Sequence, residues 1–256
     1  MRQYHSAAQL EQTFGARGVK VLTNENVKGV ESADMIILGV EPKVYEEVLS
    51  QQGMRDALTG KILVSIVGGV STKMLTNAIY GQAPLSEEEK KKGTQCQIIR
   101  VLPNTAAAVR DSTSLIIEEE KDQYPPFVLS PVASLFKRVG SIKRWPDKLA
   151  PVGSTLAASS PAFFALILEG VVDGAVKHGV DRKKALALVA AAMRGAAALV
   201  ASGEDPSEVR RKVATPGGMT VVGLNALEDS NVKALMEDAV SKAVEKGERA
   251  RTEVED

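Results

Sequence analysis

The sequence lacks most of the residues that build disulfides and metal sites. Its one cysteine, Cys96, cannot form an internal disulfide, which fits a reducing compartment. Because Cys96 opens an apolar run, we expect a buried structural thiol; a nucleophilic thiol is the less favoured alternative. The two histidines, His5 and His178, are too few and too scattered to hold a metal ion. We therefore expect neither a disulfide framework nor a metal centre.

The chain also lacks net charge. Its 32 basic and 32 acidic residues cancel, so no field favours binding to nucleic acid or to an anionic membrane. Uninterrupted apolar runs stay below the roughly 20 residues of a membrane span, and the first residues lack the apolar segment of a secretory signal. These absences predict a cytoplasmic protein that binds neither nucleic acid nor membranes.

The first part of the chain alternates short apolar runs with helical patterns. Apolar runs at residues 19–22, 33–40, 62–67, 97–102, 114–118 and 142–145 predict strands, and helical patterns separate most of them. This alternation predicts βαβ units around a parallel sheet. The mixed charge run within residues 81–93 predicts a solvated loop between a helix and a strand.

From residue 147 onward only helical patterns remain. We therefore predict an α/β domain over residues 1–146 and an all-helical domain over residues 147–256. A chain of 256 residues is long enough to form two modest hydrophobic cores. The helix predicted for residues 163–176 is apolar on all sides. Since so little chain surrounds it, we expect part of its surface to be buried in a partner subunit.

Three predicted strands end in small or polar residues. The segments at 39–42, 67–70 and 103–105 follow successive strands, and parallel sheets bind ligands beyond the carboxyl ends of their strands. Taken singly, each segment is equally well explained as an ordinary turn. Three such segments at one edge predict a ligand site.

The most informative stretch is Thr-Pro-Gly-Gly at residues 215–218, which precedes an apolar helical pattern. Thr215 is expected to cap the helix and Pro216 to be its first residue. Two glycines each cost a helix roughly 1 kcal/mol relative to alanine, so they suggest close approach of an anion to bare backbone N–H groups. The alternative is a glycine-rich link between two helices.

The run from Pro216 to Glu228 resembles the signature of pyrroline-5-carboxylate reductase, the enzyme of the last step of proline biosynthesis. The resemblance implies an oxidoreductase with a Rossmann-like NAD(P)-binding domain followed by an all-α domain that forms a homodimer or a higher oligomer. It implies hydride transfer from NADP(H), with NAD(H) as the alternative, to the C=N carbon of Δ1-pyrroline-5-carboxylate. The same resemblance assigns cofactor binding to Asn26, Gly39, Val40, Glu41, Pro42, Val67, Gly68, Gly69, Pro103, Asn104 and Thr105.

The resemblance also assigns the substrate site. The backbone N–H groups of Gly217, Gly218 and Met219 would bind the substrate carboxylate. The hydroxyl of Thr220 would act as the catalytic group, hydrogen-bonded to the ring nitrogen or to a carboxylate oxygen. Ser159, in a segment similar to the family's Ser-Gly-Ser-Gly-Pro motif, would face the active site.

Two departures from the family pattern leave alternatives open. Glu41 stands where the family usually carries lysine, so a positive charge near the cofactor becomes negative. No Gly-x-Gly turn occurs near the start of the chain, so we expect an N-terminally truncated form. A catalytically impaired paralogue that serves as a dimerisation partner is therefore one alternative. Another is a different NAD(P)-dependent reductase that acts on a related cyclic imine or on a β-hydroxy acid.

Overall fold

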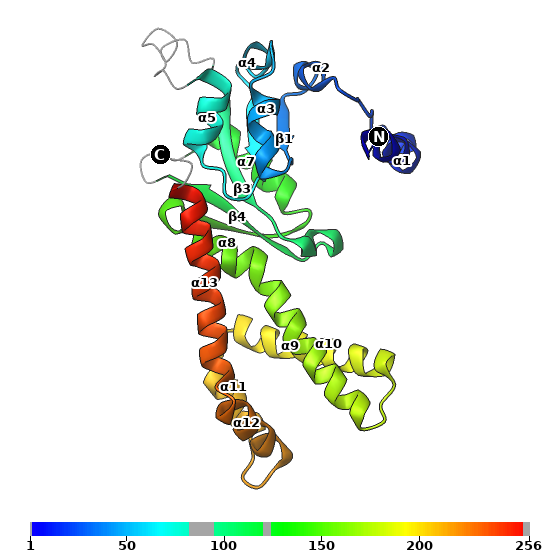
Figure 1. Cartoon of the computed structure of the whole chain (residues 1–256), viewed down its shortest axis with the longest axis vertical. Helices are drawn as coiled ribbons and strands as arrows, with labels where there is room; N and C mark the ends of the chain where they lie inside the picture. Colours follow the sequence, from blue (N-terminus) through cyan, green and yellow to red (C-terminus); the bar gives the residue numbers. More distant parts are fainter. Residues whose placement is uncertain (1, 82–94, 120–123, 253–256) are drawn as a thin grey trace. The chain divides into compact units, whose positions relative to one another are not determined.

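The protein is described by a computed structural model that covers residues 2–81, 95–119 and 124–252 (Figure 1). By its internal contacts the chain divides into two compact units. Residues 1–157 and 247–256 form the first unit, and residues 158–246 form the second. Nearly all of the predicted solvated loop within residues 81–93 lies outside the described residues.

The first unit contains a five-stranded sheet in the order β1-β2-β3-β4-β5 (Figure 1). The strands are β1 (Met35–Leu38), β2 (Ile62–Ser65), β3 (Gln97–Leu102), β4 (Ser112–Glu118) and β5 (Gly140–Pro146). All neighbours pair in parallel except β3 and β4, which are antiparallel. The prediction of a parallel sheet was wrong for this pair. Residues 103–111 connect the two strands, whereas a parallel crossover needs about a dozen residues or more.

Helices cover both faces of the sheet. Consecutive residues of β2 point to opposite faces, so Leu63 and Val64 enter different cores. The first core contains side chains from α3 (Tyr45–Leu49), α4 (Met54–Ala57) and α5 (Thr72–Tyr80). The second core contains side chains from α7 (Pro126–Phe136). Burial on both faces explains why these strands read as continuous apolar runs in the sequence.

The predicted strand at residues 19–22 is not a strand. These residues are irregular and lie between η1 (Gly15–Arg17), which follows α1 (Arg2–Phe14), and α2 (Asn26–Glu31). Within the described part of the chain, no strand pairs with them, and the sheet ends at β1. Strand geometry needs a neighbour to satisfy the backbone N–H and C=O groups, and local apolar character does not supply one.

The described residues that follow β5, up to residue 252, are mainly helical, as predicted. It comprises η4 (Asp147–Leu149), α8 (Ala150–Ser154), η5 (Thr155–Ser159), α9 (Ser160–Lys177), α10 (Arg182–Ala201), α11 (Pro206–Val213), α12 (Met219–Asp229) and α13 (Val232–Thr252). Carboxylates cap two of these helices. Asp181 accepts a hydrogen bond from the N–H of Lys184 at 3.0 Å, and Asp205 accepts one from the N–H of Ser207 at 2.8 Å.

The helices of the second unit expose large apolar side chains. Leu166 in α9 and Leu188 in α10 are each 69% exposed. By length and composition alone, the helical stretches Asp147–Lys177 and Arg182–Ala201 are long and apolar enough to cross a membrane. Searching for uninterrupted apolar runs did not reveal them. The same two properties describe a helix that is covered by another protein chain.

Candidate active site

Three predicted cofactor segments meet at one edge of the sheet. They follow β1, β2 and β3, which are adjacent and parallel, so their carboxyl ends lie side by side. Figure 1 shows how β1 and β3 share this direction. The structure therefore brings Gly39–Pro42, Val67–Gly69 and Pro103–Thr105 together at the position where such sheets bind ligands.

The segments after β1 and β2 present backbone to the solvent. Gly68 and Gly69 are exposed, and a Cβ added to either would meet no atom within 4 Å. Gly69 has a φ of 76°, a left-handed conformation that glycine adopts without strain. Val67 is buried in the core, so of the segment after β2 it is the two glycines that are exposed. The arrangement suits a ligand held by main-chain groups.

Glu41 lies in an exposed ion pair. Its carboxylate is 3.0 Å from the ammonium of Lys43, and both side chains are mostly exposed. Pro42 begins η2 (Pro42–Val44), with Glu41 in extended conformation before it. The negative charge that departs from the family pattern is therefore accompanied by a positive charge two residues later.

The side chain and the backbone N–H of Asn104 make three hydrogen bonds with other described residues. Its Oδ1 accepts from the N–H of Ala106 at 3.0 Å and so caps η3 (Thr105–Val109). Its Nδ2 donates to the carbonyl of Ala157 at 2.8 Å, and its backbone N–H donates to the Ser112 hydroxyl at 3.1 Å. A cofactor contact by Asn104 stays a prediction. In this structure its side chain fixes the loop after β3.

Asn26 precedes the three cofactor segments in the sequence, and it lines the same cavity as the first of them, Gly39–Pro42. The cavity has a volume of about 470 Å³ and is lined by Asn26, by the edge strand β1 and by Gly39 and Val40. The Asn26 amide donates to the side-chain carbonyl of Gln51 at 3.3 Å. The predicted adenosine contact of Asn26 stays a prediction.

The remaining predicted site residues belong to the second unit. Ser159 is half-buried and ends η5, a π-helical turn. Such turns are rare and frequently occur at functional sites. Gly217, Gly218, Met219 and Thr220 form the entry to α12, where Gly218 and Thr220 are half-buried and Met219 is almost fully exposed.

The Thr-Pro-Gly-Gly stretch forms a turn rather than the first turn of a helix. The N–H of Gly218 donates to the carbonyl of Thr215 at 2.9 Å, and Gly217 has a φ of 73°. Proline at the second and left-handed glycine at the third position are typical of a type II turn. Helix α12 begins at Met219 with Gly218 as its N-cap, so the expected cap at Thr215 and first residue at Pro216 were wrong.

This turn and the start of α12 differ in which of their backbone N–H groups already have an acceptor. The N–H of Gly218 is used within the turn, and that of Val221 donates to Gly218. The N–H groups of Met219 and Thr220 belong to the first turn of α12, which has no intrahelical acceptors for them. The positive end of the helix dipole adds about half a charge at the same place.

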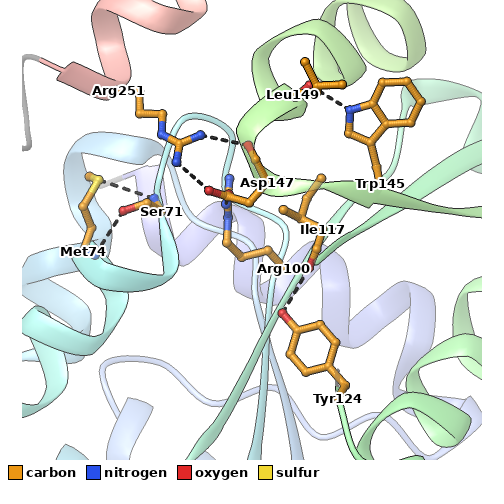
Figure 2. Close-up of polar contacts among 9 residues, drawn as sticks. All are labelled: Ser71, Met74, Arg100, Ile117, Tyr124, Trp145, Asp147, Leu149 and Arg251. Carbon is orange, nitrogen blue, oxygen red and sulfur yellow. Dashed lines mark hydrogen bonds and ion pairs between the residues drawn. The ribbon is translucent and has the colours of Figure 1, made fainter. Parts of the chain in front are cut away.

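Sequence reasoning missed a cluster of three charges, of which Arg100 is buried and Asp147 and Arg251 are partly buried. Asp147 lies between Arg100 of β3 and Arg251 of α13 (Figure 2). Its two carboxylate oxygens each accept from one guanidinium at 2.5 Å, and Arg251 also donates to the backbone carbonyl of Asp147 at 2.8 Å. The side chain of Arg100 is only 7% exposed. A lone arginine within the apolar run 97–102 was the one sequence signal that a buried acidic partner exists.

Two other buried groups have raised pKa values. Burial raises the pKa of the Cys96 thiol to about 12, which makes it the inert structural cysteine that was predicted. Burial also raises the pKa of Tyr124 to about 12, and its hydroxyl donates to the carbonyl of Ile117 at 3.1 Å (Figure 2). Among the described residues no cluster of three or more histidine, cysteine or carboxylate side chains is suited to a metal ion.

Comparison with known proteins identifies the family. A family model described as pyrroline-5-carboxylate reductase dimerisation matches residues 147–250, and one described as NADP oxidoreductase, coenzyme F420-dependent, matches residues 1–69. The pyrroline-5-carboxylate reductase of Lophium arboricola is 40% identical over 228 residues, which cover 88% of this chain and 69% of that protein. The chain belongs to the pyrroline-5-carboxylate reductase family.

Other members of the pyrroline-5-carboxylate reductase family are also similar to this chain in sequence. The enzymes of that name from Neurospora crassa and Arabidopsis thaliana are 36% and 31% identical to this chain. The matches cover 86% and 94% of this chain and 68% and 82% of those proteins. Family membership, the Rossmann-like sheet and the helical C-terminal region are thus confirmed.

Solved reductase structures share the fold. A Plasmodium falciparum pyrroline carboxylate reductase with NADP bound superposes with a TM-score of 0.76 at 24% identity, covering 90% of this chain and 81% of that chain. The Coxiella burnetii pyrroline-5-carboxylate reductase gives the same TM-score and identity, with 95% and 85% covered. At these identities the likeness shows the fold and no more.

Proposed function

We propose that this protein reduces Δ1-pyrroline-5-carboxylate to L-proline with NAD(P)H. The observation that carries the proposal is the 40% identity with a pyrroline-5-carboxylate reductase over most of both chains. Two features of the fold support it. The loops at the sheet edge can hold a nicotinamide ring, and the start of α12 can hold a carboxylate.

The residues at the sheet edge fit a nicotinamide cofactor. Gly68 and Gly69 leave open space above their backbone, and Gly39 and Glu41 are exposed beside them. We assign Gly39–Pro42, Val67–Gly69 and Pro103–Thr105 to the cofactor, with Asn26 at its adenosine end. When bound, the cofactor supplies the hydride, and the protein positions the substrate against it.

The start of α12 is assigned to the substrate carboxylate. Met219 and Thr220 offer first-turn N–H groups, and Gly217 precedes them in a left-handed conformation. The Thr220 hydroxyl would hydrogen-bond the ring nitrogen or a carboxylate oxygen. A protonated imine is already electrophilic, so a strong side-chain acid is not required. Ser159 is assigned to the edge of the same site.

We propose NADP(H) as the preferred cofactor, with NAD(H) as the alternative. The match of residues 1–69 to an NADP oxidoreductase model supports NADP(H), as does the NADP bound to the Plasmodium falciparum relative. Steady-state rates with each nucleotide, measured at several concentrations, decide between the two. A higher kcat/KM with NADH would overturn the preference.

We further propose that the protein is a cytoplasmic homodimer or a higher homo-oligomer. The exposed apolar faces of α9 and α10 fall within the match to the dimerisation model, and a second copy of the chain would cover them. Light scattering of the purified protein without detergent is expected to give at least a dimer. A requirement for detergent or lipid would instead favour the membrane reading of these helices.

The decisive experiment measures NADPH oxidation by the purified 256-residue chain in the presence of pyrroline-5-carboxylate. Turnover with formation of proline is the expected result, and Thr220→Ala should lower kcat/KM by roughly tenfold or more. A soluble oligomer that gives no turnover would favour the alternative of a non-catalytic dimerisation partner. Faster turnover with a cyclic imine that lacks the carboxylate would favour a different imine reductase.

A further inference from the structure

The three charges of this cluster connect segments that are far apart in the sequence. Arg100 lies in β3, Asp147 begins the helical stretch η4–α8–η5, and Arg251 lies in the last turn of α13 (Figure 2). All three residues belong to the first unit. Because Asp147 accepts from both arginines, its position depends on both β3 and α13.

A second connection joins the end of β3 to the stretch η4–α8–η5, closer to the proposed cofactor site. Asn104, two residues beyond β3, donates its amide N–H to the carbonyl of Ala157 at 2.8 Å. Ala157 lies within the π-helical turn η5. The end of β3 and the stretch η4–α8–η5 are thus held at two places, by the Arg100–Asp147 pair and by the Asn104–Ala157 hydrogen bond.

Helix α13 comes close to this stretch at Gly247. A Cβ added to Gly247 would lie 3.2 Å from Cβ of Pro151 in α8, closer than an ordinary contact. The absence of a side chain at Gly247 therefore lets the two helices approach. Arg251 is four residues further along the same helix and reaches Asp147 at the beginning of that stretch.

The charges of the cluster do not balance among its own members. Two guanidinium groups share one carboxylate, and among the described residues the buried Nε of Arg100 has no hydrogen-bond partner. A buried ion pair adds little net stability compared with apolar packing. This cluster fixes the direction of the Asp147 carboxylate from two sides.

We propose that Arg251 is a positioning residue of the active site. Through Asp147, the last turn of α13 sets the position of η4–α8–η5 against the end of β3, and thereby the position of the Asn104 loop. The inference rests on the proposed function, since it gives that loop a role in holding the nicotinamide. Arg251 itself is not assigned a contact with substrate or cofactor.

The test compares two Arg251 variants with a control in the same helix. Arg251→Met removes the charge at similar length, and Arg251→Lys keeps the charge with a single donor group. Lys242→Met is the control because it removes an exposed pair between Lys242 and Asp238, with 2.6 Å between Nζ and Oδ2. Each protein is assayed for kcat and for both KM values, well below its melting temperature.

Arg251→Met is expected to lower kcat/KM by up to about 100-fold, the loss that a misplacement of about 1 Å can cause. Arg251→Lys should restore part of this loss, and Lys242→Met should match the wild type. Hydrogen exchange in Arg251→Met should become faster at residues 104–109 and 155–159. A lower melting temperature with wild-type kcat, KM and exchange at these residues would overturn the proposal and leave Arg251 a purely structural role.

The exchange measurement separates this proposal from the proposed function. If the wild-type chain does not turn over pyrroline-5-carboxylate, the proposed function fails, and NADPH binding followed by fluorescence replaces the kinetic readout. Weaker NADPH binding and faster exchange in Arg251→Met would still support the positioning role. Unchanged binding and exchange would refute it whatever the substrate is.

Discussion

The entry turn of α12 allows a sharp prediction about Gly218. A Cβ at this position would lie 2.6 Å from Oγ1 of Thr215 and 3.0 Å from the Thr215 carbonyl oxygen. The hydroxyl can rotate away, but the carbonyl is held by the Gly218 N–H at 2.9 Å. Gly218→Ala must therefore open the turn by several tenths of an ångström. Overpacking of this kind costs about 1–3 kcal/mol.

The same opening would displace the backbone donors at the start of α12. If these donors bind the substrate carboxylate, Gly218→Ala should raise KM for pyrroline-5-carboxylate and lower kcat/KM by about 100-fold. KM for NADPH should change much less. Steady-state kinetics with each substrate varied in turn measures both effects.

Two companion variants show whether the backbone is the obstacle. Gly217→Asn keeps a residue that tolerates the left-handed conformation of Gly217, so it should retain more activity than Gly217→Ala. Thr215→Ala removes the hydroxyl contact and leaves the carbonyl in place, so it should not rescue Gly218→Ala. Full rescue by Thr215→Ala, or wild-type kinetics in Gly218→Ala itself, would refute the reasoning.

Three further predictions concern the first unit. Gly153→Ala would place a Cβ 2.4 Å from Nε1 of Trp145 and 2.8 Å from Cδ1 of Leu115, so it should lower the free energy of unfolding by about 1–3 kcal/mol in urea titrations. Cys96 has a folded-state pKa of about 12 against 9.0 for the free thiol, so its contribution to stability is complete below pH 9 and is lost as the pH rises toward 12. Unfolding measured across this range should show a shallower pH dependence in Cys96→Ala, and an unchanged slope would contradict this account. Glu41→Lys replaces an exposed negative charge at the proposed cofactor edge, so it should lower KM for NADPH at low salt and lose this effect at high salt. If the variant and the wild type have the same KM for NADPH at both salt concentrations, Glu41 lies away from the phosphates.

The sequence was sufficient for those features that depend on local pattern. Alternating apolar runs predicted β2 and β3 within one or two residues at either end, because each is buried on both faces of the sheet. The helical second half was equally readable from its helical patterns. The grouping of three loops at one edge followed from parallel pairing alone.

The features that were missed depend on partners. Residues 19–22 have the composition of a strand, but strand geometry requires a hydrogen-bonded neighbour, and the described residues provide none. The antiparallel pairing of β4 follows from the length of the connection after β3, which a search for apolar runs ignores. At Pro216 and Gly217 two local preferences competed, and the preference of Pro-Gly for a type II turn prevailed over that of proline for a first helical turn.

The cluster of Arg100, Asp147 and Arg251 shows why residues that hold an active site in place are harder to predict than the loops that form it. Loops at strand ends are placed by the fold class, so family resemblance and sheet topology both point to them. Arg251 is separated from Asp147 by more than 100 positions, and its sequence context is an ordinary charged helix end. Only the apolar setting of Arg100 hinted at a buried partner, and it could not say which of 32 acidic residues that partner is. A residue that positions an active site through another residue therefore has to be found in the structure. The Arg251 variants test whether Arg251 positions the site in this way.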